Sequence, residues 1–256
     1  MLETLKNLYF VLAYWLGWAL FGFGGMLLTL AFLPLLLLPR TEGLARFVRG
    51  LIKSLFQTHL TICRFDRTFI VQWRGFDRPL SRKTVFIANH PSLMDAPVLL
   101  SRLPDAICVF KPRLLRNPVI GPAALLAGYA SAGGGVDAVR ATAARVTAGR
   151  SLLIFPEGTR TRPGAVVGDL QAGFALIAAR AQAPVQLIII RVTEGITAKG
   201  RAWWKLPAVM PARMCVQLDR RWHDTSSISA ARLTREVESR MRESLSQQST
   251  PGGNGT

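Results

Sequence analysis

Apolar and polar positions divide the chain into a long apolar start, an amphipathic stretch, and a region where strand-like and helix-like runs alternate. From Asn7 to Pro39 there are 33 residues without a formal charge. As a straight helix this run would extend roughly 50 Å, more than the roughly 30 Å hydrocarbon core of a bilayer, yet two full spans need about 40 residues. The glycines of Phe21–Gly25 interrupt the run. We therefore expect two short helices, about 7–20 and 26–38, bent at the glycines into a hairpin that enters one leaflet and returns.

The main alternative for this apolar run is a single tilted span. A cleaved signal peptide fits less well, because the run is too long and lacks a small-residue cleavage pattern. Tyr14, Trp15 and Trp18 suit a membrane interface. The residues that follow are basic: Arg40, Arg46, Arg49 and Lys53. By the positive-inside tendency, this flank and the body of the protein are expected on the cytoplasmic side.

Residues 43–62 carry apolar side chains at helical spacing, with basic residues opposite them. This pattern predicts an amphipathic helix that lies on the bilayer or on the folded domain. His59 has no partner at ligand spacing, so we expect a packing or surface histidine there.

Beyond residue 66, short apolar runs alternate with amphipathic ones. The expected strands are 68–73, 84–88, 106–110, 129–132, 151–155, 185–192 and 213–219, and the expected helices are 93–101, 118–127, 136–148, 170–182 and 228–245. This alternation predicts a single α/β domain with a mostly parallel sheet covered by helices. The expected organisation is a membrane-embedded helical segment at 1–40, an amphipathic connecting helix at 41–66, the α/β domain at 67–245 and a disordered tail at 246–256.

Composition and charge point to a membrane. The chain has 256 residues, a formal net charge of +17 from 32 basic and 15 acidic residues, and 50% hydrophobic residues. A basic balance suits nucleic acid, an anionic membrane or an acidic protein, but a basic chain with a long apolar run favours the membrane. No nucleic-acid-binding motif is present, so no nucleic-acid partner is expected. The three separated cysteines, Cys63, Cys108 and Cys215, predict no disulfide framework and suit a reducing compartment.

The first stretch with chemistry is Val85–Asp95, where an apolar strand breaks at Asn89-His90-Pro91 and a helix follows. On one continuous helix, five residues rotate about 140°, so the His90 and Asp95 side chains would point apart. They meet only if His90 lies on the turn and Asp95 in the first helical turn. Pro91 and Ser92 favour that arrangement. A neutral imidazole held by a carboxylate can then act as a general base toward a hydroxyl.

A structural interpretation of the same residues competes with the catalytic one. Ser92 and Asp95 also have the spacing of a capping box, in which Asp95 merely satisfies a helix end and His90 is a turn residue. This window alone does not decide between the two interpretations.

Two further stretches place polar residues after predicted strands. In Ser151–Arg160 an apolar strand runs into a Pro-Glu-Gly turn carrying Glu157, Thr159 and Arg160, and the guanidinium of Arg160 and the backbone near Gly158 suit a phosphate. Phe110–Pro122 places three cations, Lys111, Arg113 and Arg116, on a loop that suits an anionic substrate or an acidic carrier. The alternatives are a solvated charged turn and a basic surface loop.

Taken together, three motifs resemble a known family. They are HxxxxD at His90 to Asp95, KxxLxxxPxxG from Lys111 to Gly121, and FPEGTR at Phe155 to Arg160. In order and approximate spacing they resemble the glycerolipid acyltransferases related to bacterial 1-acylglycerol-3-phosphate acyltransferase, the PlsC type. The resemblance covers about residues 83–195. Each motif is weak alone, but three in order behind a membrane-associating segment are specific.

The resemblance implies a function and roles for the matching residues. His90 would remove the proton from an acceptor hydroxyl, and Asp95 would orient it. The hydroxyl, most plausibly that of 1-acylglycerol-3-phosphate or another lysophospholipid, would attack an acyl thioester of coenzyme A or acyl carrier protein. The expected substrate-binding residues are Lys111, Arg113, Glu157, Gly158, Thr159 and Arg160. No cofactor and no metal are expected, and the family implies the bacterial inner membrane with the catalytic domain facing the cytoplasm.

Three departures from the family pattern concern the acceptor. An Ile-Asp-Arg-like strand usually follows the second motif, but here the segment reads Tyr129-Ala-Ser-Ala-Gly-Gly-Gly135; Gln171 stands where a lysine is often found, and Leu187 where a proline is common. The loss of two cations weakens the case for a phosphate-bearing acceptor. The sequences of Asn89–Asp95, Leu115–Pro118 and Trp203–Pro207 also resemble those of acyltransferases that accompany bacterial polyene and unusual fatty-acid synthesis.

Other functions remain open at the level of sequence. One is acyl transfer to a lyso-ornithine lipid or to the lipid anchor of a polyene. Another is a non-catalytic lipid-binding membrane protein, although the intact His90, Asp95 and Glu157 argue against it. A hydrolase lacks support because no Gly-x-Ser-x-Gly elbow is present.

Overall fold

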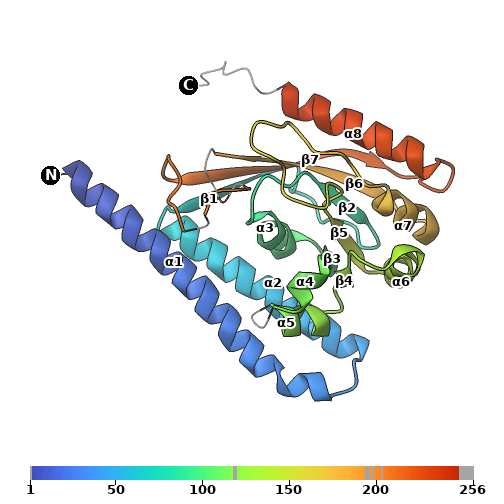
Figure 1. Ribbon diagram of the computed structural model, residues 1–256, viewed down its shortest axis with the longest axis horizontal. Coiled ribbons are helices and arrows are strands. Elements are labelled where there is room, and N and C mark those ends of the chain that lie inside the picture. The colour runs from blue at the N-terminus through green and yellow to red at the C-terminus, as the bar shows by residue number, and fades with distance from the viewer. Residues whose placement is uncertain (1, 118–119, 194–196, 198, 203, 248–256) are drawn as a thin grey trace.

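The computed structural model describes residues 2–117, 120–193, 197, 199–202 and 204–247. A seven-stranded sheet runs through it in the order β1-β7-β6-β2-β5-β3-β4 (Figure 1). Neighbouring strands are parallel except for β6 and β7, which are antiparallel. The strands are β1 (Phe69–Arg74), β2 (Val85–Ala88), β3 (Ala106–Phe110), β4 (Ala130–Ser131), β5 (Ser151–Ile154), β6 (Val185–Val192) and β7 (Ala212–Trp222). The predicted mostly parallel α/β fold is thus confirmed.

Helices cover both faces of this sheet. On one side lie α2 (Glu42–Phe65), α3 (Asp95–Arg102) and α5 (Gly121–Leu126), with α1 (Leu2–Phe32) outside them; on the other lie α6 (Gly135–Thr147), α7 (Gly173–Ala181) and α8 (Ala230–Ser246). A short helix, α4 (Pro112–Leu115), follows β3 and was not expected as a helix. The expected helix 118–127 begins at Gly121 as α5, and 118–119 lie outside the described residues.

The strands of the sheet centre are apolar on both faces, as a sheet covered on two sides requires. All four residues of β2 are buried, as are the first six of β6. Phe86, Ile87, Leu152, Leu153 and Phe174 are among the largest side chains that are fully buried. This rigid centre fixes the strand ends from which the polar motifs extend.

The N-terminal apolar run forms one long helix, α1, followed by a short 3₁₀ helix, η1 (Pro34–Leu37). The bend predicted at Phe21–Gly25 is therefore wrong. Gly24 of this cluster serves close packing against α2 instead, because a Cβ there would lie 3.3 Å from Cδ1 of Leu55. Interior glycines cost a helix roughly 1 kcal/mol each, and the close contact between helices offsets that cost.

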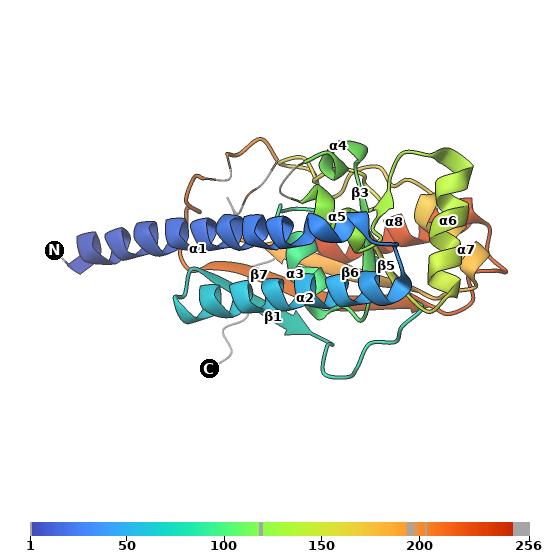
Figure 2. The ribbon, with the colours of Figure 1, turned by 90° about the horizontal axis from the view of Figure 1, so that it is seen from below.

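The chain reverses after η1 and returns as α2, so that α1 and α2 run antiparallel side by side (Figure 2). Thr41 caps α2 by accepting a hydrogen bond from Leu44 N at 3.3 Å. The predicted amphipathic helix 43–62 is present and buries Val48, Ile52 and Cys63. His59 is buried between the two helices, 4.9 Å from the ring of Phe21, and is a packing histidine as expected.

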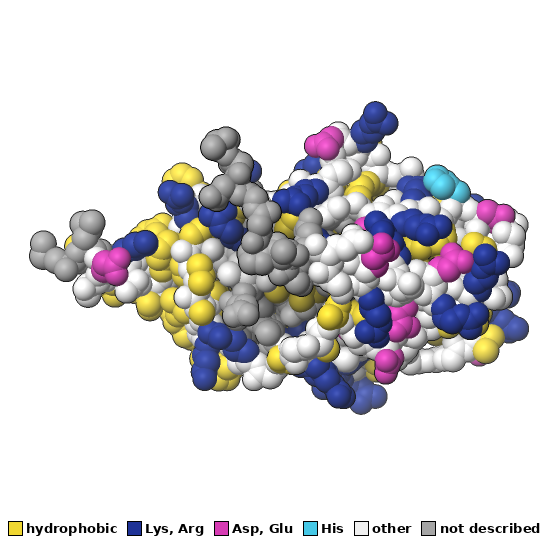
Figure 3. Space-filling model, turned by 90° about the horizontal axis from the view of Figure 1, so that it is seen from above, with side chains coloured by type: hydrophobic (Ala, Val, Ile, Leu, Met, Phe, Trp, Pro, Cys, Tyr) yellow, Lys and Arg dark blue, Asp and Glu magenta, His cyan; other side chains and the backbone are white. Residues whose placement is uncertain are grey.

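By length and composition, the segment Glu3–Leu37 is apolar enough to cross a membrane, with 11% of its most apolar window buried. The N-terminal turns of α1 project beyond the rest of the molecule (Figures 1 and 2). Hydrophobic side chains gather at that end, whereas basic and acidic side chains alternate over the opposite end of the face in Figure 3. This contrast separates an apolar end from a water-compatible body.

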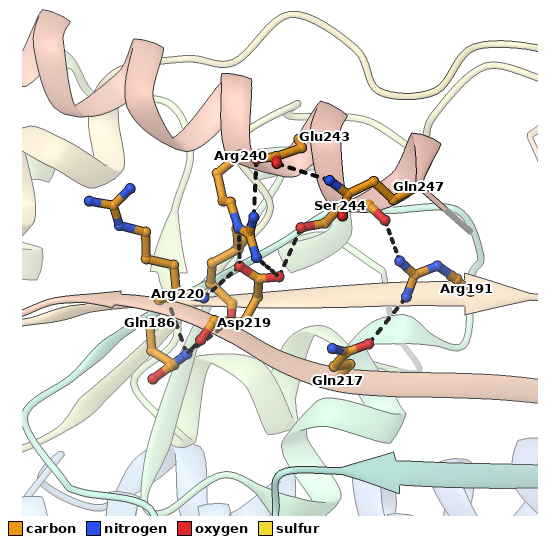
Figure 4. A network of polar contacts seen from close by, with 10 residues as sticks. Gln186, Arg191, Gln217, Asp219, Arg220, Arg240, Glu243, Ser244 and Gln247 are labelled. Carbon is orange, nitrogen blue, oxygen red and sulfur yellow. Dashed lines mark hydrogen bonds and ion pairs between the residues drawn. The ribbon is translucent and has the colours of Figure 1, made fainter. Parts of the chain in front are cut away.

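Polar contacts attach α8 to the antiparallel part of the sheet (Figure 4). Asp219 on β7 accepts hydrogen bonds from Arg240 Nε at 2.7 Å and from Ser244 Oγ at 2.8 Å. Gln186 Nε2 on β6 donates to the carbonyl oxygen of Asp219 at 3.0 Å. Together these contacts join β6, β7 and α8 into one unit. The predicted tail 246–256 lies outside the described residues except for Ser246 and Gln247, which end α8.

Candidate active site

Three adjacent parallel strands deliver the three sequence motifs to one edge of the sheet. The strands are β2, β5 and β3 in that spatial order, and His90, Glu157 and Lys111 follow their carboxyl ends. In open α/β sheets this edge is where ligands bind. The topology therefore places residues that are 67 positions apart in sequence, such as His90 and Glu157, in direct contact.

His90 and Asp95 meet in the way the turn geometry requires. Asp95 is the first residue of α3, and its Oδ2 lies 2.7 Å from His90 Nδ1. The same oxygen accepts a hydrogen bond from Ser92 N at 2.8 Å. The capping contact and the contact with the imidazole are thus made by one carboxylate oxygen, so the two interpretations of this motif coexist.

The imidazole of His90 is held by two contacts. With Nδ1 donating to Asp95, the neutral ring presents Nε2 as a proton acceptor. The ring of Phe155 stacks against it, with centroids 4.1 Å apart and planes at 20°. No residue in the described part of the chain hydrogen-bonds Nε2, and the side chain is 20% exposed. Nε2 is therefore open to an incoming hydroxyl.

Asp95 is completely buried, and that burial raises its pKa against the opposing hydrogen bonds from His90 and Ser92 N. Its Oδ1 has no hydrogen-bond partner within the described residues. A carboxylate that has lost its hydration interacts strongly with a neighbouring imidazolium. This environment suits a residue that stabilises the protonated form of His90.

The backbone of His90 is fixed from two neighbouring elements. Asn89 pairs its side chain with the backbone of Ile190 on β6, with both hydrogen bonds at 2.8 Å, and so extends the sheet by one residue. His90 N donates to Oε1 of Glu157 at 3.0 Å, and His90 O accepts from Thr161 N at 2.8 Å. The third motif therefore positions the histidine of the first.

Glu157 is buried and faces the protein interior. Besides His90 N, its carboxylate accepts hydrogen bonds from Thr161 Oγ1 at 2.9 Å and from Gly168 N at 2.8 Å. A Cβ at Gly168 would lie 2.9 Å from Oε2, so only glycine permits this approach. Glu157 thus acts on the position of His90, and its expected contact with an acceptor head group stays a prediction.

Thr197 is a site residue that sequence reasoning missed. It is buried, and its hydroxyl lies 2.8 Å from Ser92 Oγ and 3.2 Å from Leu93 N. Its carbonyl oxygen accepts a hydrogen bond from Arg160 Nη1 at 2.7 Å. Thr197 therefore joins the His90–Asp95 turn to the arginine of the third motif. No signal in the sequence marks it, since it lies outside every motif.

The other predicted binding residues lie along the same edge with more exposure. Gly158 is exposed with φ of 63°, a conformation that favours glycine, and Thr159 is half-buried beside it. A Cβ at Gly158 would lie 3.2 Å from Nε2 of Gln171, which places Gln171 at the turn. Lys111 precedes α4 and is half-buried, and Arg113 on α4 is exposed. Neither cation makes a hydrogen bond or ion pair with the described residues of the His90 cluster.

An apolar cavity adjoins the turn that carries His90. It comprises about 460 Å³ of space open at one side, and Met94 and Thr197 connect it to the site. Its other walls come mainly from α1 and α2, including Gly17, Trp18 and Cys63. Burial raises the pKa of the Cys63 thiol to about 11, so this wall is neutral near pH 7.

Among the described residues no group of three His, Cys, Asp or Glu side chains is arranged to hold a metal ion. The polar groups that gather at the carboxyl edge are instead those of an imidazole and carboxylate pair with a neighbouring guanidinium. This set suits proton transfer from a bound hydroxyl.

The chain resembles known acyltransferases in sequence. The sequence profile of the family described as Acyltransferase matches residues 71–191. A 1-acyl-sn-glycerol-3-phosphate acyltransferase from Cocos nucifera is 26% identical over 119 residues, which cover 44% of this chain and 38% of that protein. The chloroplastic 1-acyl-sn-glycerol-3-phosphate acyltransferase BAT2 from Brassica napus is 31% identical over 121 residues, covering 45% of this chain and 35% of that protein.

The fold also matches a solved structure over nearly its whole length. The crystal structure of the 1-acyl-sn-glycerophosphate acyltransferase PlsC from Thermotoga maritima superimposes with a TM-score of 0.72 at 22% identity, covering 98% of this chain and 99% of that chain. The matches with the curated plant proteins span little more than a third of their length. Residues 71–191 therefore match the Acyltransferase family model, and the chain is similar in sequence to part of two 1-acyl-sn-glycerol-3-phosphate acyltransferases and in fold to PlsC.

Proposed function

We propose that this protein is a membrane-bound O-acyltransferase that moves a fatty acyl group from a thioester to the hydroxyl of a lysophospholipid, most plausibly 1-acylglycerol-3-phosphate. The observation that carries the proposal is the contact of 2.7 Å between His90 Nδ1 and Asp95 Oδ2. It leaves Nε2 of His90 open near Arg160, which lies in the turn after β5. The names of the plant and Thermotoga proteins supply the acceptor class.

The chemistry needs one base and no covalent enzyme intermediate. Nε2 of His90 takes the proton of the acceptor hydroxyl as its oxygen attacks the thioester carbon. The tetrahedral intermediate then collapses, the carbon–sulfur bond breaks, and the thiolate takes the proton back from the imidazolium. Asp95 stabilises that imidazolium and keeps the productive tautomer. Phe155 and the contacts from Glu157 hold the ring in place.

Arg160 is our candidate for binding the acceptor head group. Nη1 of Arg160 donates a hydrogen bond to Thr197 O, and this contact orients the guanidinium group next to the turn that carries His90. Guanidinium groups bind phosphate oxygens in bidentate geometry. Gly158 and Thr159 would donate from the same turn, and Lys111 with Arg113 would add positive charge from the neighbouring strand end. The same cations suit the phosphates of coenzyme A or an acidic acyl carrier protein as donor.

The apolar parts of the substrates fit the apolar surroundings. The cavity lined by Met94, Gly17 and Trp18 leads from the site toward α1 and α2. We propose that α1 holds this side at the membrane, so that a lysolipid reaches His90 with its chain still among lipids. The proposed location is the bacterial inner membrane. The basic residues after residue 39 favour the cytoplasmic side for the catalytic domain.

The test is acyl transfer by the detergent-solubilised protein from labelled acyl-coenzyme A and acyl carrier protein thioesters to a panel of lysolipids. We expect His90→Ala to lower kcat by about 10³-fold and Asp95→Asn by about 10²-fold, the range for losing a general base or its orienting partner. His223→Ala is the matched control, because His223 is exposed and far along the chain after β7. Activity of His90→Ala equal to that of an active wild type would overturn the mechanism.

The acceptor panel separates two candidate substrates. At two positions where lysophosphatidate enzymes commonly have cations, this chain has uncharged residues. Gln171 lies beside Gly158, and a Cβ added at Gly133 would lie 3.1 Å from Cγ of Pro112. That observation favours testing a zwitterionic acceptor such as a lyso-ornithine lipid. If lysophosphatidate is the acceptor, Arg160→Gln should raise its KM about tenfold and leave the thioester KM unchanged. Transfer only to the zwitterionic lipid would instead establish the second candidate.

A further inference from the structure

A second cavity lies at the opposite edge of the sheet from His90. It comprises about 540 Å³ of space, open at one side. Leu103, Asp105 and Ala106 line it at the start of β3, and Arg82 lines it just before β2. His90 follows the other end of β2. The length of these strands therefore separates this cavity, which we call the basic cavity, from the acyl-transfer site.

Cations dominate the lining of the basic cavity. Its ionisable lining residues are Arg46, Arg49, Lys53, Arg82, Asp105 and Tyr129. Four of these carry a positive charge near neutral pH and one carries a negative charge, which leaves a formal excess of three positive charges. Such an excess in a confined space is unfavourable unless solvent or an anion offsets it.

Only one of the four cations is matched by carboxylates. Arg49 is buried and bonds to Asp105 Oδ1 and Glu42 Oε1, both at 2.7 Å, and to Ala127 O at 2.9 Å. Glu42 also pairs with Arg150, so its charge is shared. Arg49 is thus a structural member of the wall, with its charge already balanced.

The remaining three cations have no carboxylate partner in the described part of the chain. Lys53 Nζ reaches only carbonyl oxygens, that of Leu103 at 3.1 Å and that of Arg102 at 3.4 Å. Burial lowers the pKa of Lys53, and the nearby guanidinium of Arg102 lowers it further. Arg46 and Arg82 are exposed, and their side chains form no hydrogen bond or ion pair with the described residues. These three side chains converge on one cavity from α2 and from the segment before β2.

We propose that the basic cavity binds a phosphate group between Arg46, Lys53 and Arg82. Two guanidinium forks and an ammonium group are the donors that proteins use for phosphate oxygens. Because the cavity is open to solvent, a phosphate ester can enter it as well as the free ion. This inference does not depend on the proposed acyl transfer.

The surroundings favour a phospholipid head group as the source of the phosphate. Phe47, next to Arg46 on α2, is 58% exposed, and Leu37 in the preceding 3₁₀ helix is 91% exposed. Exposed apolar side chains beside a cationic cavity are the combination found where a protein meets the surface of an anionic membrane. The bound phosphate would hold the start of α2 at head-group depth.

The experiment measures binding of two probes to the full chain, inorganic phosphate and a short-chain soluble phosphatidate, by calorimetry at constant ionic strength. The Arg160→Gln background removes the phosphate contact proposed at the acyl-transfer site. The test variant is Arg46→Gln/Arg82→Gln. The matched control is Arg180→Gln/Arg235→Gln, which removes the same charge from two exposed arginines with no described partner.

We expect the test variant to weaken binding of the phosphate probe at least about tenfold and the control less than about twofold. Arg46→Lys/Arg82→Lys should recover part of the affinity, because lysine keeps the positive charge but lacks the bidentate guanidinium. If both probes bind, free phosphate is sufficient as a ligand of the basic cavity. If only phosphatidate binds, the ligand is the phosphate of a lipid head group. Equal weakening in test and control variants, or no binding of either probe, would overturn the proposal. We also measure acyl transfer by the Arg46→Gln/Arg82→Gln variant in the wild-type background and expect a rate within about twofold of wild type. This measurement separates loss of phosphate binding in the basic cavity from failure of the proposed acyl transfer.

Discussion

At the scale of single residues, Thr197 shows how a site can depend on a position that no motif marks. It is a buried β-branched residue with φ of 39°, a left-handed conformation that such residues rarely adopt. A conformation of this kind persists where surrounding contacts determine it, often at functional sites. Here the contacts are those to Ser92, Leu93 and Arg160.

Thr197→Val should therefore lower activity more than stability. The substitution keeps the side-chain shape but removes the hydroxyl that contacts Ser92 Oγ and Leu93 N. We expect kcat to fall about tenfold, because the turn that orients Asp95 loses both contacts, and Thr197→Ser to recover most of the activity. Steady-state kinetics of acyl transfer measures this effect.

The control for Thr197 is Thr225→Val, which also removes a buried threonine hydroxyl, one that donates to Ala183 O at 2.9 Å. Both variants should lose about 1–2 kcal/mol of unfolding free energy, the cost of a buried hydrogen bond. Only Thr197→Val should lower kcat. Equal kcat values in the two variants would show that Thr197 is merely structural.

Sequence spacing anticipated the contact between His90 and Asp95, because proline, serine and the strand end together restrict the turn. It did not anticipate that Glu157 faces inward. The six-residue motif Phe155–Arg160 suggests an exposed binding turn, but the close approach of Gly168 provides an inward partner for Glu157 that only the folded chain reveals. Contacts across long sequence separations are what a single sequence leaves unspecified.

At the scale of elements, the spacing of apolar residues and the local composition were sufficient to locate most strands and helices. Each buried strand of the parallel centre appears as a short apolar run between turn residues, as expected for a sheet covered on both faces. The glycines of α1 were misleading because a glycine cluster predicts a bend when a helix is considered alone. Against α2, Gly24 allows close packing.

The attachment of α8 leads to a prediction about stability. Asp219 is 4% exposed at its side chain and pairs with Arg240 at 2.7 Å. Asp219→Asn should lower the free energy of unfolding by about 2–3 kcal/mol, because Arg240 loses the more buried of its two carboxylate partners, Asp219 and Glu243, and the contact with Ser244 weakens. Thermal or urea unfolding measures the loss. Asp224→Asn, at an exposed aspartate after β7, should change stability much less.

The same pair makes stability depend on pH in a defined direction. Burial raises the pKa of Asp219, but the hydrogen bonds from Arg240 and Ser244 outweigh it and hold the pKa below its ordinary value. A carboxyl group with a lowered pKa stabilises the fold above its unfolded pKa, about 3.9, and loses that contribution as the pH falls through the folded value. The stability difference between wild type and Asp219→Asn should therefore shrink below about pH 4. A difference that grows with acid would contradict this assignment.

At the scale of the whole molecule, one end is apolar and the rest carries a large positive charge. We expect the net charge of +17 to attract an anionic bilayer and the exposed leucines of α1 to insert into it. Leu12 and Leu16 are 61% and 60% exposed on α1. In water such surface is unfavourable, so its presence along one projecting helix favours the proposed placement of α1 in lipid.

Replacing these two leucines tests that placement. Leu12→Gln/Leu16→Gln should reduce partitioning into neutral phosphatidylcholine vesicles about a hundredfold, since burying a leucine contributes about 1.5 kcal/mol or more. The control, Val136→Gln/Leu176→Gln, removes two exposed apolar side chains from α6 and α7 and should leave partitioning unchanged. Sedimentation with vesicles measures both. Because neutral vesicles remove the electrostatic contribution, equal partitioning of the Leu12→Gln/Leu16→Gln variant and wild type would mean that α1 lies against protein, and the membrane placement would be wrong.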